Sequence, residues 1–451
     1  MKISKNILFI MVLLGLCSNR LDAWANTNFF RTDDFLVQHT HVPQKKFLFG
    51  ANLETGGRST GLDASSNRQS VLAIHDRTQS VVSMLLNNVA DVHAKLPVTQ
   101  PQLESTGVML PGYPVPITDP GDAPAIGRLK FSGDYDQTDV TFLSKYGFVI
   151  GFIPGTFNLS LYVPFIKKEI SDFQYKDLTQ EFEPARIVLK NTVIDNLVQN
   201  VEQYGNLHLK DGHLSGLGDS LCMLEWCKIF EPEGVRKKTW GKKKDSQQLW
   251  QRIALLIKGG FLVPTGKSAH EDNAFGVSLG HDDTWGFPGS VGLDVAFNDV
   301  ISFGLNLDFL YLFDKSKVRR LKTNKGQTDF LLLSKGRATK RNGLTWRLSS
   351  YARLFEFFRR WFFKVSYQFI KHQEDRLVPL DSRFKNEIIN TSKSLEEWDS
   401  HNVGFHIEYS SEKYAEHTGM IPHIGFFYKF PLTGNSVIDM HTFGAHISFS
   451  F

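Results

Sequence analysis

The residues with the clearest potential for chemistry are few, and the first group is Gly266-Lys267-Ser268. A phosphate-binding loop ends in such a triplet and needs an earlier glycine separated from Gly266 by four residues. Gly260 lies one residue too far away, and no helical pattern follows the triplet. We therefore predict a strand that ends in a Pro-Thr-Gly turn, without a nucleotide site.

Histidine is the second residue type that could bind a metal or act in catalysis. The 15 histidines include the pairs His401/His406 and His441/His446, each five residues apart. The two members of such a pair face opposite sides of a strand, and no cluster has the spacing of metal ligands. We predict no metal site, no cofactor and no catalytic residue.

Polar residues at alternate positions of apolar segments form the third group. In the segment 300–313, Asn306 and Asp308 alternate with Leu305, Leu307 and Phe309. Charges of both signs at such positions suit the hydrated or salt-bridged interior of a membrane β-barrel. The candidates for a lumen lining are Arg252, Lys258, Asp294, Asn306, Asp308, Arg347, Arg353, Lys364, Glu408 and His446.

Strands must position these side chains, and alternation of period two recurs from residue 137 onward. The predicted strands are 137–148, 155–166, 216–229, 248–264, 275–282, 287–298, 300–313, 342–357, 361–371, 400–411, 420–431 and 437–451. A further pair from 47–55 and 128–136 would make fourteen, and we prefer twelve. The predicted fold class is all-β: a closed antiparallel transmembrane β-barrel of about 12 strands, with an N-terminal irregular or helical segment.

Composition separates a membrane barrel from its alternatives. The 451 residues include 37 phenylalanines, yet the hydrophobic fraction is 41% and the net charge is +4. After residue 25 no apolar run is long enough for a membrane helix, and the small charge gives no reason to expect a nucleic-acid partner. The strands of a soluble β-sandwich also alternate between apolar and polar residues, but the long strands and the aromatic residues near their ends favour a membrane barrel.

Cys222 and Cys227 face opposite sides of one strand and are predicted to be free thiols.

The N-terminus has the pattern of a cleavable signal peptide over residues 1–25. Lys2 and Lys5 precede the apolar stretch 7–16, and Ala23-Trp24-Ala25 provides small residues where a signal peptidase cleaves. This pattern predicts export to the bacterial outer membrane. Residues 26–126 are predicted to form a periplasmic segment or lumen plug, followed by the barrel over 127–451.

Loop lengths predict which connections share a side of the membrane. The short connections at 299 and 358–360 suit periplasmic turns, and the longer ones at 230–247, 314–341 and 372–399 suit outer loops. The segment 167–215 is then a long periplasmic insertion, with helical spacing over 191–204. The basic stretches 236–244 and 315–322 are interpreted as solvated loops, with binding of an anionic ligand as the less favoured alternative.

The last strand resembles the assembly signal of outer-membrane barrels, which implies the barrel-assembly machinery as a partner. The residues that carry this resemblance are Thr442, Gly444, Ile447, Phe449 and the terminal Phe451. Ile447 stands where an aromatic residue is usual, and two residues follow Phe449.

Two short motifs carry a resemblance to a known family. Gly216-Leu217-Gly218-Asp219 opens one predicted strand, and Leu262-Val263-Pro264-Thr265-Gly266 closes the next. Together they resemble the transporter-like outer-membrane barrels associated with meta-pathway phenol degradation and, more remotely, the fatty-acid and aromatic-hydrocarbon transporters. Val263 stands where that family has Leu. The resemblance covers 216–313 and the last strand, and it implies passage of small hydrophobic compounds.

Three functions follow as hypotheses. The first is an outer-membrane channel or transporter for small hydrophobic molecules, with outer-membrane lipid and a small solute as partners. The second is a structural or surface-interaction barrel that acts through its long outer loops. The third and least favoured is a lipid hydrolase, because His441 is the one clear outward histidine and no Ser–His cluster accompanies it.

Overall fold

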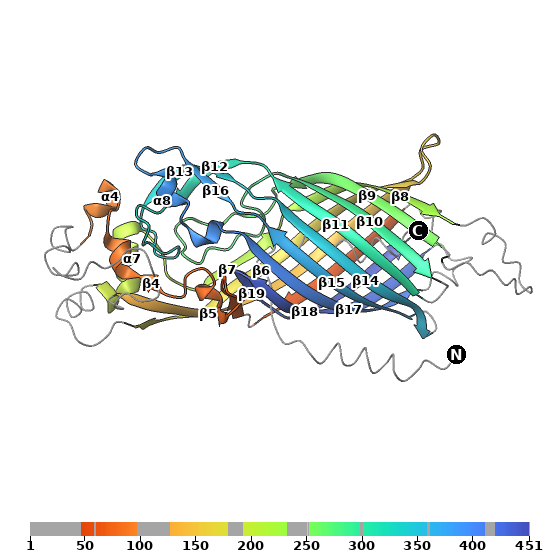
Figure 1. Ribbon diagram of the computed structural model, residues 1–451, viewed down its shortest axis with the longest axis horizontal. Coiled ribbons are helices and arrows are strands. Elements are labelled where there is room, and N and C mark those ends of the chain that lie inside the picture. The colour runs from red at the N-terminus through yellow and green to blue at the C-terminus, as the bar shows by residue number, and fades with distance from the viewer. Residues whose placement is uncertain are drawn as a thin grey trace, which may run out of the picture.

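The computed structural model describes residues 47–57, 60–96, 127–178, 193–231, 250, 252–297, 301–358, 361–410 and 420–450. Twelve strands form an antiparallel barrel, seen from the side in Figure 1. They are β1 (Phe47–Gly56), β5 (Arg128–Phe148), β6 (Thr156–Asp177), β8 (Ser220–Phe230), β9 (Arg252–Val263), β10 (Gly286–Phe297), β11 (Ile301–Leu312), β14 (Thr345–Phe358), β15 (Trp361–His372), β17 (Trp398–Ser410), β18 (Ile421–Asn435) and β20 (Thr442–Ser450).

The barrel is closed because β1 joins the last strand to the first hairpin. Leu48–Gly56 pairs with Thr442–Ser450 of β20 on one side. On its other side, β1 pairs with β5, which in turn pairs with β6. Every strand of the ring therefore has two neighbours, so the predicted closed antiparallel barrel of 12 strands is confirmed. Two short strands, β4 (Gln79–Ser80) and β7 (Gly212–Leu217), add to its edges.

One member of the predicted set of strands is wrong. Residues 275–282 are not a strand but part of the long connection between β9 and β10. The twelfth strand is instead β1, which lies within the predicted N-terminal segment 26–126. The alternation in 275–282 positions Phe275 and Val277 in an apolar core beyond the barrel wall, so the pattern reports burial without strand pairing.

The two faces of the barrel wall differ in chemistry. In β11, Phe303 and Leu305 are 48% and 49% exposed, whereas Ser302 and Asp308 are 0% and 3% exposed. The apolar residues therefore face outward and the polar residues face inward, which reverses the arrangement of a soluble barrel. This reversal is what a lipid environment requires. Among the described residues, no helix is both long and apolar enough to cross a membrane.

Connections differ in length at the two ends of the barrel. At the end that we call the turn end, the gaps 149–155, 231–251, 298–300, 359–360 and 411–420 join neighbouring strands, and all but 231–251 are short. The opposite end, the loop end, carries the connections 178–219, 264–285, 313–344 and 373–397. The predicted tight turns at 299 and 358–360 thus lie at one end, with 314–341 and 372–399 at the other.

The predicted sides of two other connections are wrong. The insertion begins at residue 178, since β6 extends to Asp177, and it lies at the loop end with the other long connections. The connection between β8 and β9 lies at the turn end, not with the outer loops. Counting 275–282 in place of β1 changed the number of strands before these connections and thereby inverted their sides.

The described residues of the loop end form a folded cap, which comprises 60–96, 193–211, 264–285, 313–344 and 373–397 (Figure 1). Its elements are β2 (Thr60–Leu62), β3 (Arg68–Ser70), η2 (Val71–Ala73), α3 (Val81–Leu85), α4 (Ala90–His93), α7 (Leu197–Gly205), β12 (Lys315–Arg320), β13 (Lys335–Arg341), β16 (Arg376–Pro379), α8 (Asn386–Ile389) and η4 (Lys393–Leu395). Strands β2 and β3 form a small sheet with β19 (Val437–Asp439), and β12, β13 and β16 form another.

An apolar core holds the cap together. It combines Leu72 and Met84 from the 60–96 segment with Leu197 from α7 and Leu331 from the 313–344 loop. The outer part of β5 adds Phe131, which is 1% exposed. The helical spacing predicted within 191–204 is confirmed by α7, whose Leu197 and Val201 are buried. The cap is therefore a packed unit built from segments far apart in sequence.

Several predictions fall outside the described residues. These are the signal peptide over 1–25, residues 26–46 and 97–126 of the 26–126 segment, the basic stretch 236–244 and the terminal Phe451.

Candidate functional site

All ten candidates for the lumen lining lie on the inner face of the barrel wall. Each is at most 8% exposed, and the positions beside them in the same strands carry the outward apolar residues. Alternation along the strand is the local cause, since successive side chains point to opposite faces. Whether these residues contact a solute stays a prediction.

One buried charge pair in the interior joins strands that are not consecutive in the sequence. Lys145 Nζ of β5 lies 2.5 Å from Glu225 Oε2 of β8, and the Glu225 side chain is 0% exposed. The hydroxyl of Ser160 on β6 donates to Glu225 Oε1 at 3.1 Å. Lys258 stands directly opposite Glu225 on β9. Four neighbouring strands thus meet at one carboxylate.

A second group lies on strands β9, β10 and β14. Arg252 donates to Asp294 Oδ1 at 3.3 Å, and the Tyr351 hydroxyl donates to Asp294 Oδ2 at 2.8 Å. Farther along, Arg347 donates to Asp308 Oδ2 from both Nε and Nη2, at 2.8 and 2.6 Å. Arginine and aspartate side chains thus link neighbouring strands on the inner face by hydrogen bonds.

The remaining interior groups lie near the closure of the barrel. His446 Nε2 of β20 lies 3.9 Å from Glu408 Oε1 of β17. Lys429 Nζ of β18 lies 3.6 Å from Glu54 Oε2 of β1. Arg353 and Lys364, two like charges, stand directly opposite each other on β14 and β15. Charge of both signs is therefore spread around the interior.

Sequence reasoning missed four members of this interior: Glu54, Lys145, Glu225 and Tyr351. Glu54 was missed because β1 was not assigned as a strand. Tyr351 shares the spacing of Arg347 and Arg353, so alternation could have placed it on the inner face. No sequence signal indicates that Lys145 pairs with Glu225, since the contact spans three strands.

The two motifs behind the family resemblance contact each other at the loop end. Asp219 accepts hydrogen bonds from the backbone NH of Gly266 at 3.0 Å and from that of His281 at 2.5 Å. The Thr265 hydroxyl donates to the Gly218 carbonyl at 2.6 Å. These contacts fasten the 264–285 connection to the start of β8. We call this group of residues the Asp219 clasp.

The surroundings of Gly266-Lys267-Ser268 do not suit a phosphate-binding loop. β9 ends at Val263, and no helix follows Gly266. The Ser268 hydroxyl donates to the Asp283 carboxylate at 3.0 Å. The negative charge of Asp283 beside Ser268 would repel a phosphate group.

Histidines near the barrel ends bind tyrosines. Tyr428 Oη lies 2.6 Å from His441 Nδ1, and Tyr367 Oη lies 2.6 Å from His401 Nδ1. In the part of the chain that the structure describes, no three metal-binding side chains are grouped as a site. A hydrolase based on His441 would need a serine nucleophile beside it, and its hydrogen-bond partner is a tyrosine.

Three basic residues of β12 are paired with carboxylates of the cap. Lys317 and Arg319 pair with Asp282, and Arg320 pairs with Asp272 at 2.8 Å. Burial alone would raise the pKa of Asp282, but Lys317 and Arg319 outweigh burial and hold the pKa below its ordinary value. These cations are therefore structural, which removes the main support for an anionic ligand at 315–322.

A closed barrel of twelve antiparallel strands, apolar outside and charged inside, with mostly short connections at one end, defines a transmembrane β-barrel of the outer-membrane type. No protein-family model matches the sequence, and no curated protein matches it.

Three solved structures illustrate the similarity in fold. An outer membrane channel from Pseudomonas putida F1 is 7% identical, with a TM-score of 0.48 over 91% of this chain and 97% of that one. A Pseudomonas putida toluene transporter is 9% identical, with a TM-score of 0.33 over 96% and 95%. A Pseudomonas aeruginosa FadL homologue is 10% identical, with a TM-score of 0.29 over 90% and 90%. Similarities this distant carry no functional argument. The function of this chain is therefore inferred from its own residues.

Proposed function

We propose that this protein is an outer-membrane channel for small hydrophobic molecules. The observation that carries the channel is the charged inner face within a closed, lipid-compatible wall. Charges of both signs on the inner face suit a hydrated interior, which a channel requires. The proposal describes a transport protein, not an enzyme.

The class of cargo rests on the two motifs that resemble the phenol-pathway family. Their contact through Asp219 supports that resemblance, because it explains why both motifs occur together. The long connections of the loop end would face the outside and the termini the periplasm, as is usual for such barrels. The exported location and cleavage after Ala25 belong to the same proposal.

Conductance of the full-length protein in planar lipid bilayers tests the channel. We expect discrete openings, and a membrane that stays sealed to ions and to small solutes would contradict the proposal. Uptake of a labelled monoaromatic compound by cells that express the protein tests the cargo, with uptake of a sugar of similar mass as the comparison. Equal uptake of both compounds would mean that the channel has no preference for hydrophobic solutes, which would contradict the proposed cargo.

A surface-interaction role remains a second candidate because the cap is a folded unit with its own apolar core. The β12–β13–β16 sheet projects from the barrel at the loop end (Figure 1). If this role is the principal one, removing residues 315–341 abolishes binding to a partner and leaves conductance unchanged. If the channel is principal, conductance changes.

A further inference from the structure

The interior of the barrel contains a row of apolar side chains beside its charged groups. Direct strand pairing places seven inward-facing residues in one row across seven neighbouring strands: Gly50, Leu143, Tyr162, Leu221, Leu262, Gly286 and Leu312. The side chains of this row form a single buried cluster with those of Leu48, Met223, Leu310 and Ile370. We call the nine side chains of this cluster the apolar stripe.

The apolar stripe connects the two ends of the barrel. A row of directly paired residues runs perpendicular to the strands, and the strands are tilted against the barrel axis (Figure 1). The row therefore climbs as it passes round the wall. Leu48 is the second residue of β1, at the turn end, and Leu312 is the last residue of β11, at the loop end.

The row holds no charged side chain at any of its seven positions. Its one hydroxyl, on Tyr162, donates to Glu225 Oε1 outside the stripe at 3.4 Å. At Gly286, a Cβ atom would lie 2.9 Å from Cδ2 of Leu312 and 3.2 Å from Cδ1 of Leu310. These two leucines thus cover the glycine, and the apolar surface continues across β10.

The stripe differs from its surroundings in how it treats solutes. Lys258 and Asp308 lie on its turn-end side, and Asp139 lies on its loop-end side. Each side chain of the stripe is at most 8% exposed, so other parts of the chain cover it and water does not. A hydrated ion that followed the stripe would lose its water without a polar replacement. An apolar molecule would exchange one set of apolar contacts for another.

We propose that the apolar stripe is the route by which small apolar molecules cross the barrel, and that it selects against polar and charged solutes. The proposal rests on the channel function proposed above and adds the path within the lumen. Cargo enters beside Leu312 at the loop end and leaves beside Leu48 at the turn end. Because the stripe is covered, the cargo displaces side chains as it moves.

Photolabelling of the full-length protein in lipid nanodiscs tests whether the stripe accepts an apolar molecule. The probe is a small aryl diazirine, which inserts into neighbouring bonds on illumination. Along β11, Leu310 and Leu312 are buried on the inner face, whereas Leu305 and Leu307 are each 49% exposed on the lipid face. We expect label on both pairs. Excess toluene should abolish the inner label alone, because the stripe saturates and the lipid does not. Label confined to the lipid face, or inner label that toluene does not reduce, would overturn the proposal.

Uptake by cells tests whether the stripe is the route. Leu262→Asn places an amide within the stripe and should lower uptake of a labelled monoaromatic compound about tenfold, as expected for one poorly paired buried polar group. Leu262→Ala keeps the position apolar and should retain uptake. Ile166→Asn is the matched control, since Ile166 is also buried on the inner face but lies outside the stripe. Heat-modifiable gel mobility shows which variants are folded, and Leu312→Asn replaces Leu262→Asn if that variant does not fold.

The outcomes separate the route from the channel. Undiminished uptake in the folded stripe variants, or an equal loss in Ile166→Asn, would refute the stripe as the route while the channel function stands. Wild-type uptake no greater than that of cells without the protein would refute the proposed function and the route together. Photolabelling would then still decide whether the stripe binds apolar molecules.

Discussion

At the scale of single residues, the interior of the barrel combines charges that neutralise one another across strands. Glu225 is 0% exposed and receives Lys145 at 2.5 Å and the Ser160 hydroxyl at 3.1 Å. Removing one partner of a buried pair leaves an uncompensated charge, whereas an exposed pair contributes little because water screens it. The interior pairs should therefore matter for stability far more than those on the rim.

Lys145→Met should destabilise the barrel by about 3–5 kcal/mol because it removes the cation that lies 2.5 Å from the buried Glu225 carboxylate. Lys167→Met removes a pair with Glu169 whose side chains are 52% and 37% exposed, and it should change stability far less because water screens the pair. Urea unfolding followed by gel mobility without boiling measures both. Equal effects would mean that the interior around Glu225 is as hydrated as the rim.

Asp219→Asn should loosen the connection between β9 and β10 without unfolding the barrel. The carboxylate accepts from two backbone NH groups, and an amide retains one acceptor oxygen. The loss should amount to about 1–3 kcal/mol locally. Limited proteolysis within 264–285 should accelerate, and Asp211→Asn serves as a comparison because its carboxylate accepts from Phe173 elsewhere in the cap. Unchanged proteolysis would show that Asp219 does not fasten this connection.

At the scale of elements, glycines allow strands to pack under aromatic rings. A Cβ at Gly444 would lie 2.0 Å from Cζ of Phe427, and one at Gly304 would lie 1.9 Å from Cζ of Tyr351. Such rings cover the glycines of neighbouring strands and help to fix their register. Gly444 in the assembly-signal resemblance therefore also has a packing role within β20. Thr442 is buried on the inner face and Ile447 faces outward, 40% exposed.

Gly444→Ala should destabilise the barrel by about 1–3 kcal/mol through overpacking against Phe427. Adding Phe427→Ala should relieve the clash, so that the two changes together cost less than the sum of their separate effects. Gly151→Ala is the matched control, since a Cβ there meets no atom within 4 Å. Strictly additive effects in urea unfolding would argue against the ring as the cause.

Strand β1 closes the barrel, so an interruption within it should prevent closure. Ala51 pairs with Ile447 of β20 and with Phe142 of β5, and Ala51→Pro removes an NH from a strand bonded on both sides. We expect little folded protein by heat-modifiable gel mobility. Val149→Pro, in the exposed turn after β5, should fold normally. Normal folding of both would mean that closure does not depend on regular pairing of β1.

At the scale of the whole molecule, the strand order fixes which connections lie on the same side of the membrane. Lys325 lies in the cap and Gly151 at the turn end, and both side-chain positions are exposed. In intact cells, a membrane-impermeant maleimide should label Lys325→Cys at once and Gly151→Cys only after the outer membrane is permeabilised. The opposite result would invert the proposed orientation.

The sequence by itself determined the class of fold and the chemistry of each face. An apolar side chain at every second position can be buried in lipid only if its neighbours face inward, so alternation in 300–313 or 361–371 settles which residues point inward. For that reason all ten candidate residues lie on the inner face.

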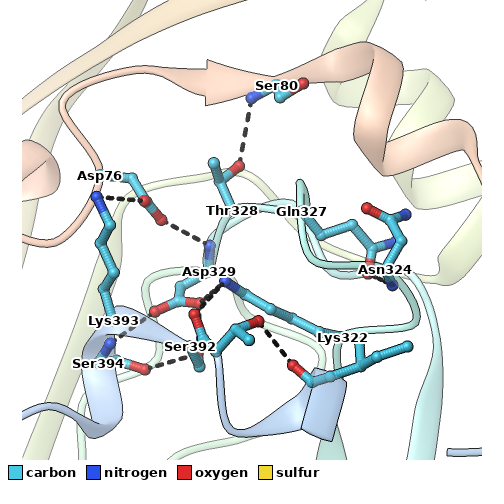
Figure 2. Close-up of polar contacts among 12 residues, drawn as sticks. Asp76, Ser80, Lys322, Asn324, Gln327, Thr328, Asp329, Ser392, Lys393 and Ser394 are labelled. Atoms are coloured by element: carbon cyan, nitrogen blue, oxygen red, sulfur yellow. Dashed lines mark hydrogen bonds and ion pairs between the residues drawn. The ribbon is translucent and has the colours of Figure 1, made fainter. Parts of the chain in front are cut away.

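Only the tertiary structure decided which segments are strands, how the barrel closes and which charges meet. Phe47–Gly56 and residues 275–282 both alternate, but β1 finds strand partners on both sides and 275–282 packs in the cap. Alternation records local burial, while strand pairing depends on backbone partners far away in the chain. The same reason explains the ion pair of Lys145 with Glu225 and the hydrogen bond from the backbone NH of Asp329 to the Asp76 carboxylate (Figure 2). Each contact is set by strand order and packing, which no local pattern encodes.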